Sequence, residues 1–538
     1  MQEVPVVIVG GGPVGLTASI LLSRLGVRSL LVERHPGTAI HPKARGINAR
    51  TMEVFRQCGV ETAVRRAGLS PERTGLIVWV RTLAGEEIER RVPARSSIAA
   101  ARLSPARNCV CAQDDLEPVL RACAEAQVCG ALRFNAEVIA CEQDDMGVTA
   151  KIVDRRDGGE TSVRARYVIA ADGAQSRLRR QLGIEMVGRR DVYESVNILF
   201  NADLRPWTAH RPAALYFVEH PKIRATFLTI NGVDRWGFLV NNLSGYGYHM
   251  QDFTPERSTD LIRLAVGVPD LDVKILGIVP WTASAHVAAA YRRGRIFVAG
   301  DAAHEMPPTG GFGLNTGVQD VHNLAWKLSA VLAAAASDEL LDTYHDERHP
   351  IGQLITEQSL ANTLSMGRVG GRAPGPITAR PEYLNEQGLI FGARYASRAI
   401  VADDSEPLAL SDPITQYAPS GRPGGRAPHV WLQHEGNRQS TLDLVDGFTL
   451  MTGHAGQPWV EAVGKLAPQL NLPLAAHIIG GTNVADAEGV WRRAYGVDDG
   501  GAVLVRPDGY IGWRTRSASA TPREDVRGAL AQILAKRI

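Results

Sequence analysis

The clearest chemistry in the sequence is carried by glycines, not by a nucleophile or a metal cluster. The pattern Gly10-x-Gly12-x-x-Gly15 directly follows a β-branched apolar run and opens an apolar segment typical of a helix. Glycines at this spacing permit a tight turn, let the backbone approach a pyrophosphate and allow close helix packing. Glu33 ends the next apolar run, where its carboxylate can accept hydrogen bonds from ribose hydroxyls. The pattern predicts a site for the ADP half of FAD or NAD.

A second group of residues favours FAD over NAD. The strand expected at 295–299 is followed by Gly300 and Asp301, and then by Pro308 and a glycine-rich stretch that leads into a helix. An aspartate at a strand end can bind a ribityl hydroxyl. A glycine-rich helix start can place N–H groups and its positive dipole end against developing negative charge, such as that of a reduced flavin. The alternative is an ordinary turn before a hydrophobic helix.

Composition and charge exclude several other functions. The chain has 538 residues, of which 45% are hydrophobic and 22% charged, as in globular proteins. Its net charge of +2 gives no field that would attract nucleic acid or an anionic membrane. No apolar run is long enough to span a bilayer. The 6 cysteines all lie at or before Cys141 without zinc-type spacing, so we expect no metal site and a reducing, cytoplasmic location.

The elements that must position these residues suggest three parts. Strand and helix signals alternate over residues 1–184 and 286–400, which predicts an α/β, Rossmann-like FAD-binding domain that is discontinuous in sequence. Between them, 185–285 shows strand-like alternation, as expected for an inserted antiparallel sheet that binds substrate. Glycine, proline and arginine dominate 366–428, as in a linker. The tail, residues 421–538, alternates strand and helix again and forms a third domain.

Three separated motifs together resemble a known family. They are the glycine pattern at 10–15, the segment 172–179 that begins Asp-Gly, and Gly300-Asp301. Their order and spacing are similar to those of the single-component (group A) FAD-dependent aromatic hydroxylases of the para-hydroxybenzoate hydroxylase fold. The segment 42–53 and Gln113 resemble the same family. Within it, the chain is most similar to the longer enzymes that tailor anthracyclinones, angucyclinones and indolocarbazoles.

The tail resembles the thioredoxin-like C-terminal domain of those longer enzymes. It contains no cysteine, so it cannot perform dithiol chemistry. A structural or oligomeric role is expected instead, and a homodimer is one arrangement that this leaves open.

The resemblance implies an FAD-dependent monooxygenase that uses NADPH or NADH and O2. In this family a C4a-hydroperoxide of the flavin hydroxylates an electron-rich ring, here that of a polycyclic aromatic phenol. Because the flavin does the chemistry, no catalytic side chain is assigned. Baeyer–Villiger insertion, epoxidation or oxidative decarboxylation on the same fold are alternatives, and a flavin-fold binding protein is the non-enzyme alternative. The expected cofactor-binding residues are Gly10, Gly12, Pro13, Val14, Gly15, Glu33, Arg34, Arg45, Gln113, Asp172, Gly300, Asp301, Pro308, Gly311, Gly313, Leu314 and Asn315.

Aromatic residues of the inserted sheet offer a wall for the substrate. The aromatic candidates are Tyr216, Phe217, Phe227, Trp236, Phe238 and Trp281. Of these we expect Tyr216, Phe227, Phe238 and Trp281 to line it, although core packing is an equally good interpretation of each. His304 is expected to pack or hydrogen-bond, not to react. Side chains that could assist phenol deprotonation, among which the sequence does not choose, are Tyr216, Tyr246, Tyr248, His249 and Arg224.

Overall fold

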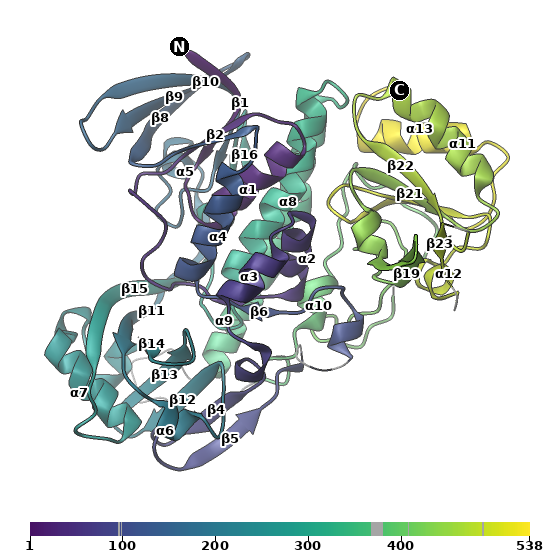
Figure 1. Ribbon diagram of the computed structural model, residues 1–538. Coiled ribbons are helices and arrows are strands. Elements are labelled where there is room, and N and C mark those ends of the chain that lie inside the picture. The colour runs from purple at the N-terminus through teal and green to yellow at the C-terminus, as the bar shows by residue number, and fades with distance from the viewer. Residues whose placement is uncertain (95–96, 98, 367–379, 407, 482, 487–488) are drawn as a thin grey trace.

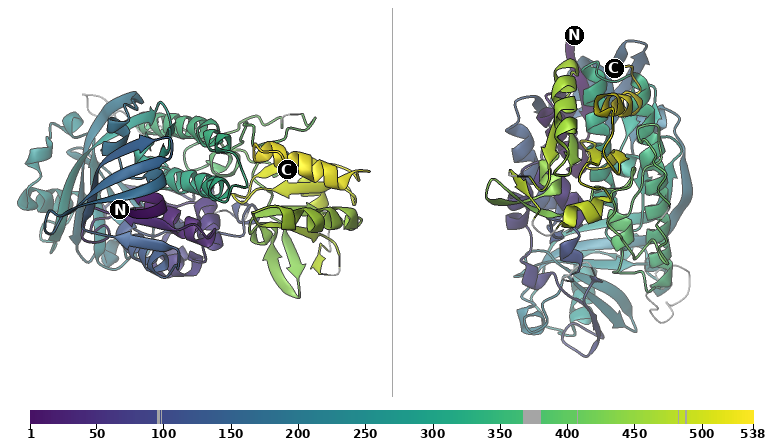
Figure 2. Two further views of the ribbon diagram at one scale, coloured as in Figure 1. Left: turned by 90° about the horizontal axis from the view of Figure 1, so that it is seen from above. Right: turned by 90° about the vertical axis from the view of Figure 1, so that its right-hand side faces the viewer.

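The chain folds into two large sheets with long helices beside them, and a C-terminal part lies on the other side of those helices (Figures 1 and 2). The glycine- and proline-rich run expected at 370–375 lies outside the described residues. The computed structural model describes residues 1–94, 97, 99–366, 380–406, 408–481, 483–486 and 489–538.

The first sheet is built on parallel strands. Its strands are β1 Gln2–Val9, β2 Ser29–Val32, β7 Gly130–Arg133, β8 Ala136–Asp144, β9 Gly147–Asp154, β10 Glu160–Ala170, β16 Arg292–Arg293 and β17 Ile296–Val298. The order is β16-β17-β10-β1-β2-β7, with β9 and β8 joined antiparallel beside β10. Val6, Val7 and Ile8 of β1 are completely buried, as a continuous β-branched run requires.

Long helices pack near this sheet. They and the short helices around them are α1 Pro13–Arg24, α2 Ala49–Gln57, α3 Glu61–Ala67, α4 Gln113–Glu125, α5 Arg177–Gln181, α8 Gly313–Leu332, α9 Thr343–Ser365 and α10 Gln387–Phe391. Helix α1 contacts both α4 and α8, and a two-stranded pairing of β3 (Gly46–Ile47) with β6 (Cys109–Val110) lies near the start of α2. Among the described residues, no helix combines the length and the apolarity needed to cross a membrane.

The second sheet is mainly antiparallel. Its strands are β4 Ile77–Val80, β5 Glu87–Arg91, β11 Met186–Asn201, β12 Leu215–His220, β13 Ile223–Thr229, β14 Arg235–Asn241, β15 Lys274–Ala288 and β18 His304–Glu305. The order is β18-β15-β11-β14-β13-β12-β4-β5. Two of these strands, β4 and β5, come from residues 77–91, which the sequence patterns did not reveal; β4 pairs in parallel with the distant β12. Helices α6 (Arg205–Thr208) and α7 (Pro255–Val266) accompany this sheet, and α7 buries Leu261 and Ile262 with it.

The tail has the thioredoxin-like arrangement that the sequence analysis expects. Its elements are β19 Trp431–His434, β20 Asn437–Ser440, β21 Phe448–Thr452, α11 Gln457–Leu466, β22 Leu474–Ile478, β23 Val484–Ala485, α12 Val490–Tyr495, β24 Ala502–Val505, β25 Ile511–Thr515 and α13 Pro522–Ile533. The central sheet has the order β22-β21-β24-β25, parallel between β21 and β22 and antiparallel elsewhere. The predicted α/β fold class is confirmed.

One buried histidine makes the fold sensitive to acid. His322 of α8 hydrogen-bonds to Gln57 Oε1 at 2.7 Å, and burial together with the nearby Arg50 lowers its pKa to about 3. An unfolded histidine takes up its proton near pH 6.5, so between that pH and about 3 the unfolded chain binds more protons than the folded one. Stability is therefore lost as the pH falls through this window.

We expect His322→Asn to flatten this dependence. Between pH 7 and pH 5, protonation of this histidine in the unfolded chain should lower the free energy of unfolding of the wild type by about 2 kcal/mol. His322→Asn should not show this loss. Urea titrations of both proteins at the two pH values measure the difference, with the exposed His210→Asn as control. An identical pH slope in wild type and His322→Asn would refute this role.

Candidate cofactor and substrate site

Three motifs that are far apart in the sequence meet at one edge of the first sheet. β1, β10 and β17 are adjacent and parallel, so their carboxyl ends lie side by side. The glycine turn at 10–15 follows β1, Asp172 follows β10, and Asp301 follows β17. Ligands of open α/β sheets bind at this edge. The structure therefore brings together the motifs on which the sequence analysis depends.

Close backbone contacts explain why this turn contains glycines. A Cβ on Gly10 would lie 2.2 Å from the carbonyl oxygen of Ala171, and Gly10 has a φ of +107°. A Cβ on Gly15 would lie 2.0 Å from the carbonyl oxygen of Gly10. Gly12 differs, because its nearest neighbour would be Glu117 Oε1 at 3.9 Å. Packing requires glycine at positions 10 and 15, whereas the backbone of Gly12 is open for a ligand to approach.

Helices α1 and α8 touch through small residues. A Cβ on Gly317, in the second turn of α8, would lie 2.8 Å from Gly300 Cα and 2.7 Å from Val14 Cγ2. The close packing leaves Pro13 and Gly313, the first residues of the two helices, lining the same cavity. Each helix start carries a partial positive charge. The space between them therefore suits an anionic or electron-rich ligand.

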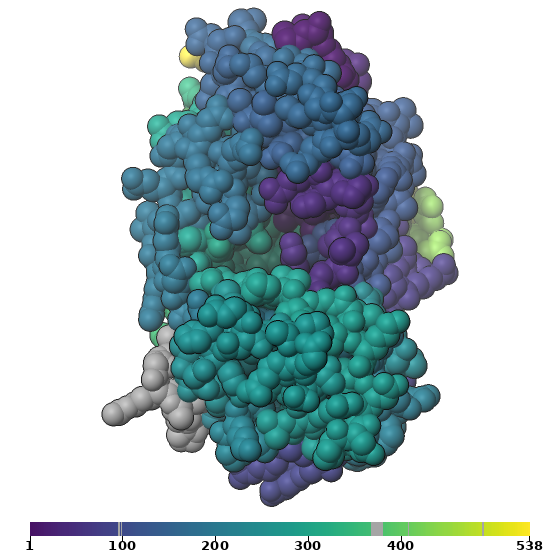
Figure 3. All heavy atoms as spheres, turned by 90° about the vertical axis from the view of Figure 1, so that its left-hand side faces the viewer, coloured from purple at the N-terminus to yellow at the C-terminus, as the bar shows by residue number. Residues whose placement is uncertain are grey.

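One large cavity occupies this space. Its volume is about 1890 Å³, and it extends from the sheet edge past the loop 34–45 to one face of the second sheet. Figure 3 shows a hollow between the purple N-terminal residues and the teal residues of the second sheet. Gly15 and Gly300 do not line the cavity; they lie in the backbone and helix contacts behind it. The predicted cofactor residues that line it are Gly10, Gly12, Pro13, Val14, Glu33, Arg34, Arg45, Gln113, Asp172, Asp301, Pro308, Gly311, Gly313, Leu314 and Asn315.

Two carboxylates at the sheet edge are partly held by backbone N–H groups. Glu33 accepts hydrogen bonds from the N–H groups of Gly11 at 2.6 Å and His35 at 2.8 Å. Asp172 Oδ2 accepts one from Arg177 N–H at 2.9 Å, whereas its buried Oδ1 has no hydrogen-bond partner in the part of the chain that the structure describes. An unpartnered carboxylate oxygen at a cavity wall suits a ligand that donates hydrogen bonds.

The loop at 34–45 is held from two sides. Glu117 of α4 accepts a hydrogen bond of 2.5 Å from a backbone N–H of this loop. Burial raises the pKa of Glu117, and its hydrogen bonds oppose this effect. On the other side, Arg45 donates to the carbonyl oxygens of Thr229 and Ala214, both at 2.7 Å. Arg45 thus connects the cofactor end of the cavity to the second sheet.

His304 belongs to a buried charge network behind the cavity. Its Nε2 lies 2.7 Å from Asp320 Oδ2, and Arg348 Nε donates to Asp320 Oδ1 at 2.9 Å, with all three side chains 0% exposed. The N–H of Gly300 donates to the same carboxylate at 3.2 Å. Asp301 itself faces the cavity, where burial raises the pKa of its carboxyl although His304 opposes this. His304 therefore hydrogen-bonds behind the turn that presents Asp301, as the sequence analysis expects.

Strand register corrects the expected substrate wall. Tyr216, Phe227 and Phe238 are direct neighbours across β12, β13 and β14, so they share one face, and that face packs in the core under α7. Of the four predicted aromatic residues, only Trp281 lines the cavity. Side chains alternate between the faces of a sheet, so the cavity face carries the residues in between. These are Asn197, Leu215, Phe217, Thr226, Leu228, Leu239, Val279, Trp281 and Ala283. Thr282, which has the opposite phase in its strand, also borders the cavity.

The residues considered for phenol deprotonation also lie away from the cavity. Tyr216 donates its hydroxyl hydrogen bond to Arg211 O at 2.8 Å, and Arg224 pairs with Glu219 at 2.6 Å. The candidates absent from the described cavity lining are Tyr216, Tyr246, Tyr248, His249 and Arg224.

The sequence patterns did not reveal His41, a cavity-lining histidine whose pKa is lowered by burial and then by Lys43 and Arg235. No spacing rule marks a single histidine in a loop.

Residues of the segment 383–391 also line the cavity. Tyr383, Leu384, Ile390 and Phe391 add apolar surface to it, and Tyr383 and Leu384 pack against Phe217 of the second sheet. Nothing in the local sequence indicates this contact, because it forms only when the chain returns past α9 to the sheet.

These groups together fit an FAD molecule. Two helix starts suit the pyrophosphate and a reduced ring, the open Gly12 backbone permits close approach, and acids at the strand ends can accept hydrogen bonds from ligand hydroxyls. Apolar surface on the second sheet can then receive a further ligand in the same cavity. The arrangement combines a dinucleotide site with an adjoining apolar chamber.

Comparison with known proteins gives consistent matches along the whole chain. A family model described as FAD binding domain matches residues 3–359, and one described as aromatic-ring hydroxylase, C-terminal, matches 420–536. A putative polyketide hydroxylase of Streptomyces halstedii is 42% identical, over 99% of this chain and 97% of that protein. A 4-methyl-5-nitrocatechol 5-monooxygenase of a Burkholderia species is 40% identical, over 99% and 98%. The solved structure of the flavin-dependent monooxygenase PieE with FAD and substrate has a TM-score of 0.91 at 36% identity, covering 99% of both chains.

The contact between α1 and α8 can be tested with a matched pair of helical glycines. The Cβ that Gly317→Ala adds would push α8 away from both Gly300 and Val14. We therefore expect this variant to lower the free energy of unfolding by about 1 to 3 kcal/mol and to weaken FAD retention. Gly528 of α13 is exposed, and a Cβ added there would meet no atom within 4 Å, so Gly528→Ala should stabilise by about 0.5 to 1 kcal/mol. Urea titration and released-flavin fluorescence measure both. Equal stability changes in the two variants would contradict the proposed contact.

Proposed function

The chain belongs to the FAD-dependent aromatic-ring hydroxylases, and from this we propose that it uses NADPH or NADH and O2 to hydroxylate a polycyclic phenol of the polyketide type. The size and continuity of the cavity carry the proposal. Sites for one drug-sized ligand usually measure roughly 300 to 1,000 Å³, and this cavity of about 1890 Å³ exceeds that range. Room for a multi-ring substrate therefore adjoins the room for FAD. A relative that acts on a nitrocatechol makes a single-ring phenol the second candidate.

We assign the cofactor contacts as follows. The turn from Gly10 to Val14, with Glu33, would hold the ADP half, and Asp301 would bind the ribityl chain. The first turn of α8, residues 313–315, would stabilise the negative charge of a reduced flavin. When bound, FAD would supply the redox chemistry for hydroxylating an aromatic ring, with NAD(P)H as reductant and O2 as oxidant.

The electron donor would be a nicotinamide nucleotide that has no binding domain of its own. Basic side chains at the cofactor end of the cavity offer local contacts to its phosphates, although acids such as Glu33, Glu137 and Asp172 line the same cavity. No second glycine pattern follows a strand in the sequence, so the donor has no Rossmann domain of its own and would bind transiently. The basic residues that line this end are Arg34, Lys43, Arg177 and Arg180.

The protein's own contribution is to orient the substrate and exclude water. Phe217, Leu228 and Leu239 form an apolar wall on the second sheet, and Phe391 adds apolar surface to the same cavity. Such walls favour planar aromatic rings and leave few sites for water beside them. Arg45 links the loop 34–45 to this sheet through its hydrogen bonds to Thr229 O at the end of β13 and Ala214 O just before β12.

The proposal predicts which substrates stimulate the enzyme. Purified protein should be yellow, and three- or four-ring phenols should accelerate NAD(P)H oxidation and O2 uptake at least tenfold over the rate without substrate, with a product heavier by one oxygen atom. Rates and product masses for a panel of polycyclic and single-ring phenols provide the measurement. Efficient turnover of catechols alone would overturn the polycyclic assignment. Ring expansion to a lactone would indicate Baeyer–Villiger chemistry instead of hydroxylation.

Strand register predicts a second difference, between neighbouring aromatic residues. Phe217 faces the cavity and stacks on Trp79 with ring centroids 5.0 Å apart, whereas Phe227 lies in the core on the opposite face. We expect Phe217→Ala to raise KM for the substrate about tenfold, equivalent to roughly 1.4 kcal/mol. Phe227→Leu should lower stability by about 1 kcal/mol and leave KM unchanged. Steady-state kinetics and urea titration of both variants decide, and a reversed pattern would show that the substrate lies elsewhere.

A further inference from the structure

The tail reaches into the FAD-binding part of the chain with buried charges. Arg506 of the tail donates two hydrogen bonds to Glu347 of α9, Nη1 to Oε1 at 2.6 Å and Nη2 to Oε2 at 2.8 Å. Lys327 of α8 binds the same carboxylate at 2.8 Å, and Asn323 of α8 donates to it at 2.6 Å. The charged side chains of this group are all 0% exposed. Through Glu347, Arg506 is thus connected to the middle of α8.

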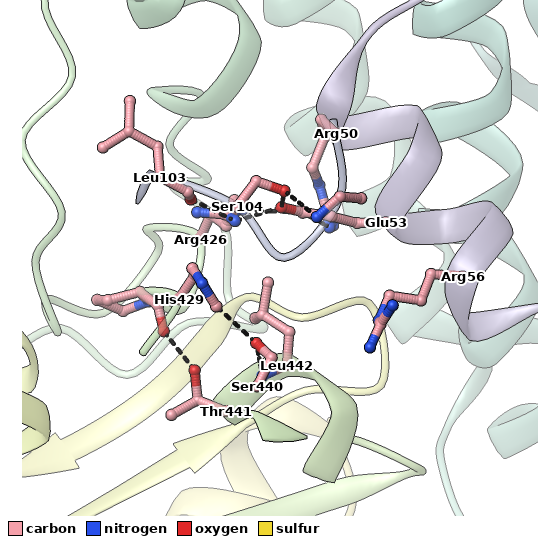
Figure 4. Close-up of polar contacts among 12 residues, drawn as sticks. Arg50, Glu53, Arg56, Leu103, Ser104, Arg426, His429, Ser440, Thr441 and Leu442 are labelled. Carbon is pink, nitrogen blue, oxygen red and sulfur yellow. Dashed lines mark hydrogen bonds and ion pairs between the residues drawn. The ribbon is translucent and has the colours of Figure 1, made fainter. Parts of the chain in front are cut away.

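A second tail arginine is bound to α2 in a similar way. Figure 4 shows Arg426 beside Glu53, whose carboxylate it binds with both Nε, at 3.0 Å, and Nη2. Arg50 and Ser104 bind the same carboxylate at 2.8 Å and 2.5 Å. Burial alone would raise the pKa of Glu53, but Arg426 and then Arg50 outweigh it and lower this pKa to about 2. Glu53 is therefore ionised in the core and depends on the tail for one of its two cations.

Loss of one charged side chain from either of these buried groups would destabilise the folded protein. Removing one partner of a buried ion pair strongly destabilises a protein, because the other charge stays buried without compensation. Arginine also matches a carboxylate with two parallel N–H groups, which fixes orientation as well as distance. The contact between the tail and the two helices is therefore directional, unlike an apolar interface of the same size.

The helices held in this way begin at the cavity. Ala49, the first residue of α2, lines it, as do Gly313 to Asn315 at the start of α8. Their starts are joined, because the N–H of Asn48 donates to Asn315 Oδ1 and Asn315 Nδ2 donates to Gly46 O, both at 2.9 Å. Among the described residues that line the cavity, none comes from the tail. The tail therefore reaches the cofactor site indirectly, through α2 and α8 and through the ring of Phe391, over which Arg426 lies at 4.8 Å.

We propose that Arg506 and Arg426 are positioning residues for the FAD site, and that the tail serves as a brace which fixes α2 and α8 so that their first turns fit the cofactor. The proposal rests on the FAD site described above and not on the identity of the substrate. The cysteine-free, thioredoxin-like tail would then assist cofactor binding although none of its described residues touches the cofactor cavity. A purely structural role would instead lower the stability of the whole chain and leave the affinity of the folded protein for FAD unchanged.

Arginine-to-lysine variants separate the two roles, because lysine keeps the charge and loses the paired geometry. The matched control is Arg514→Lys: Arg514 is a buried tail arginine that binds Asp403 at 2.9 and 2.5 Å and touches neither α2 nor α8 by any bond that the structure describes. The holoenzyme is diluted in steps, and the fluorescence of released FAD gives its Kd. The visible absorption band of the bound flavin is recorded in parallel. No substrate or NAD(P)H is present, so a failure here is distinct from a failure of the proposed reaction.

We expect Arg506→Lys and Arg426→Lys to raise the Kd for FAD at least tenfold and to shift the flavin band, whereas Arg514→Lys changes neither. Values within twofold of wild type in the folded variants would overturn the proposal, as would an equal rise in the control. If the lysine variants do not fold, the Kd for FAD of Arg56→Ala provides the test instead. Arg56 of α2 is 36% exposed and bridges to Asp443 of the tail at 2.6 Å, so its loss should spare the fold. A Kd raised about threefold would support the brace, and an unchanged one would overturn it.

Discussion

The contact of Val14 in α1 with Gly317 in α8 and with Gly300 in the turn after β17 constrains the rest of the cofactor site. A side chain at either position would meet Val14, so the two helices can approach only if both positions carry no more than hydrogen. Their approach brings two helix starts to one cavity, at the edge where three parallel strands end. Partial positive charge from both helices and acids at the strand ends then surround the same space. The polarity of this end of the cavity follows from backbone geometry more than from any single side chain.

Buried charged side chains lie behind the cavity and along the helices. Behind the cavity, Asp320 binds both His304 and Arg348. Further along the helices, Glu347 and Glu53 form ion pairs with arginines of the tail. Ion pairs of this kind add little net stability compared with apolar packing, but they tolerate only one geometry. We therefore regard them as devices that set helix position. The apolar wall of the second sheet, in contrast, carries almost no charge, as suits an aromatic ligand.

The sequence was sufficient where a local pattern and a backbone requirement coincide. The turn at 10–15, Asp172, Asp301 and the start of α8 could all be located because each follows an apolar strand signal, and the structure brings them to one cavity. The substrate wall could not be located in this way. Aromatic content selected Tyr216, Phe227 and Phe238, yet the phase of each strand decides the face, and that phase is set by pairing with distant strands. The parallel contact of β4 with β12 and the return of residues 383–391 to the cavity are likewise long-range events without a local signal.

A crystal structure of the protein with FAD and a polycyclic phenol tests the central claim most directly. The account predicts density for the flavin ring against the first turn of α8, with the adenine end near Glu33 and the phenol between the ring and the face that carries Phe217 and Trp281. A flavin ring seated away from Gly313 to Asn315, or a phenol on the face that carries Phe227, would contradict it.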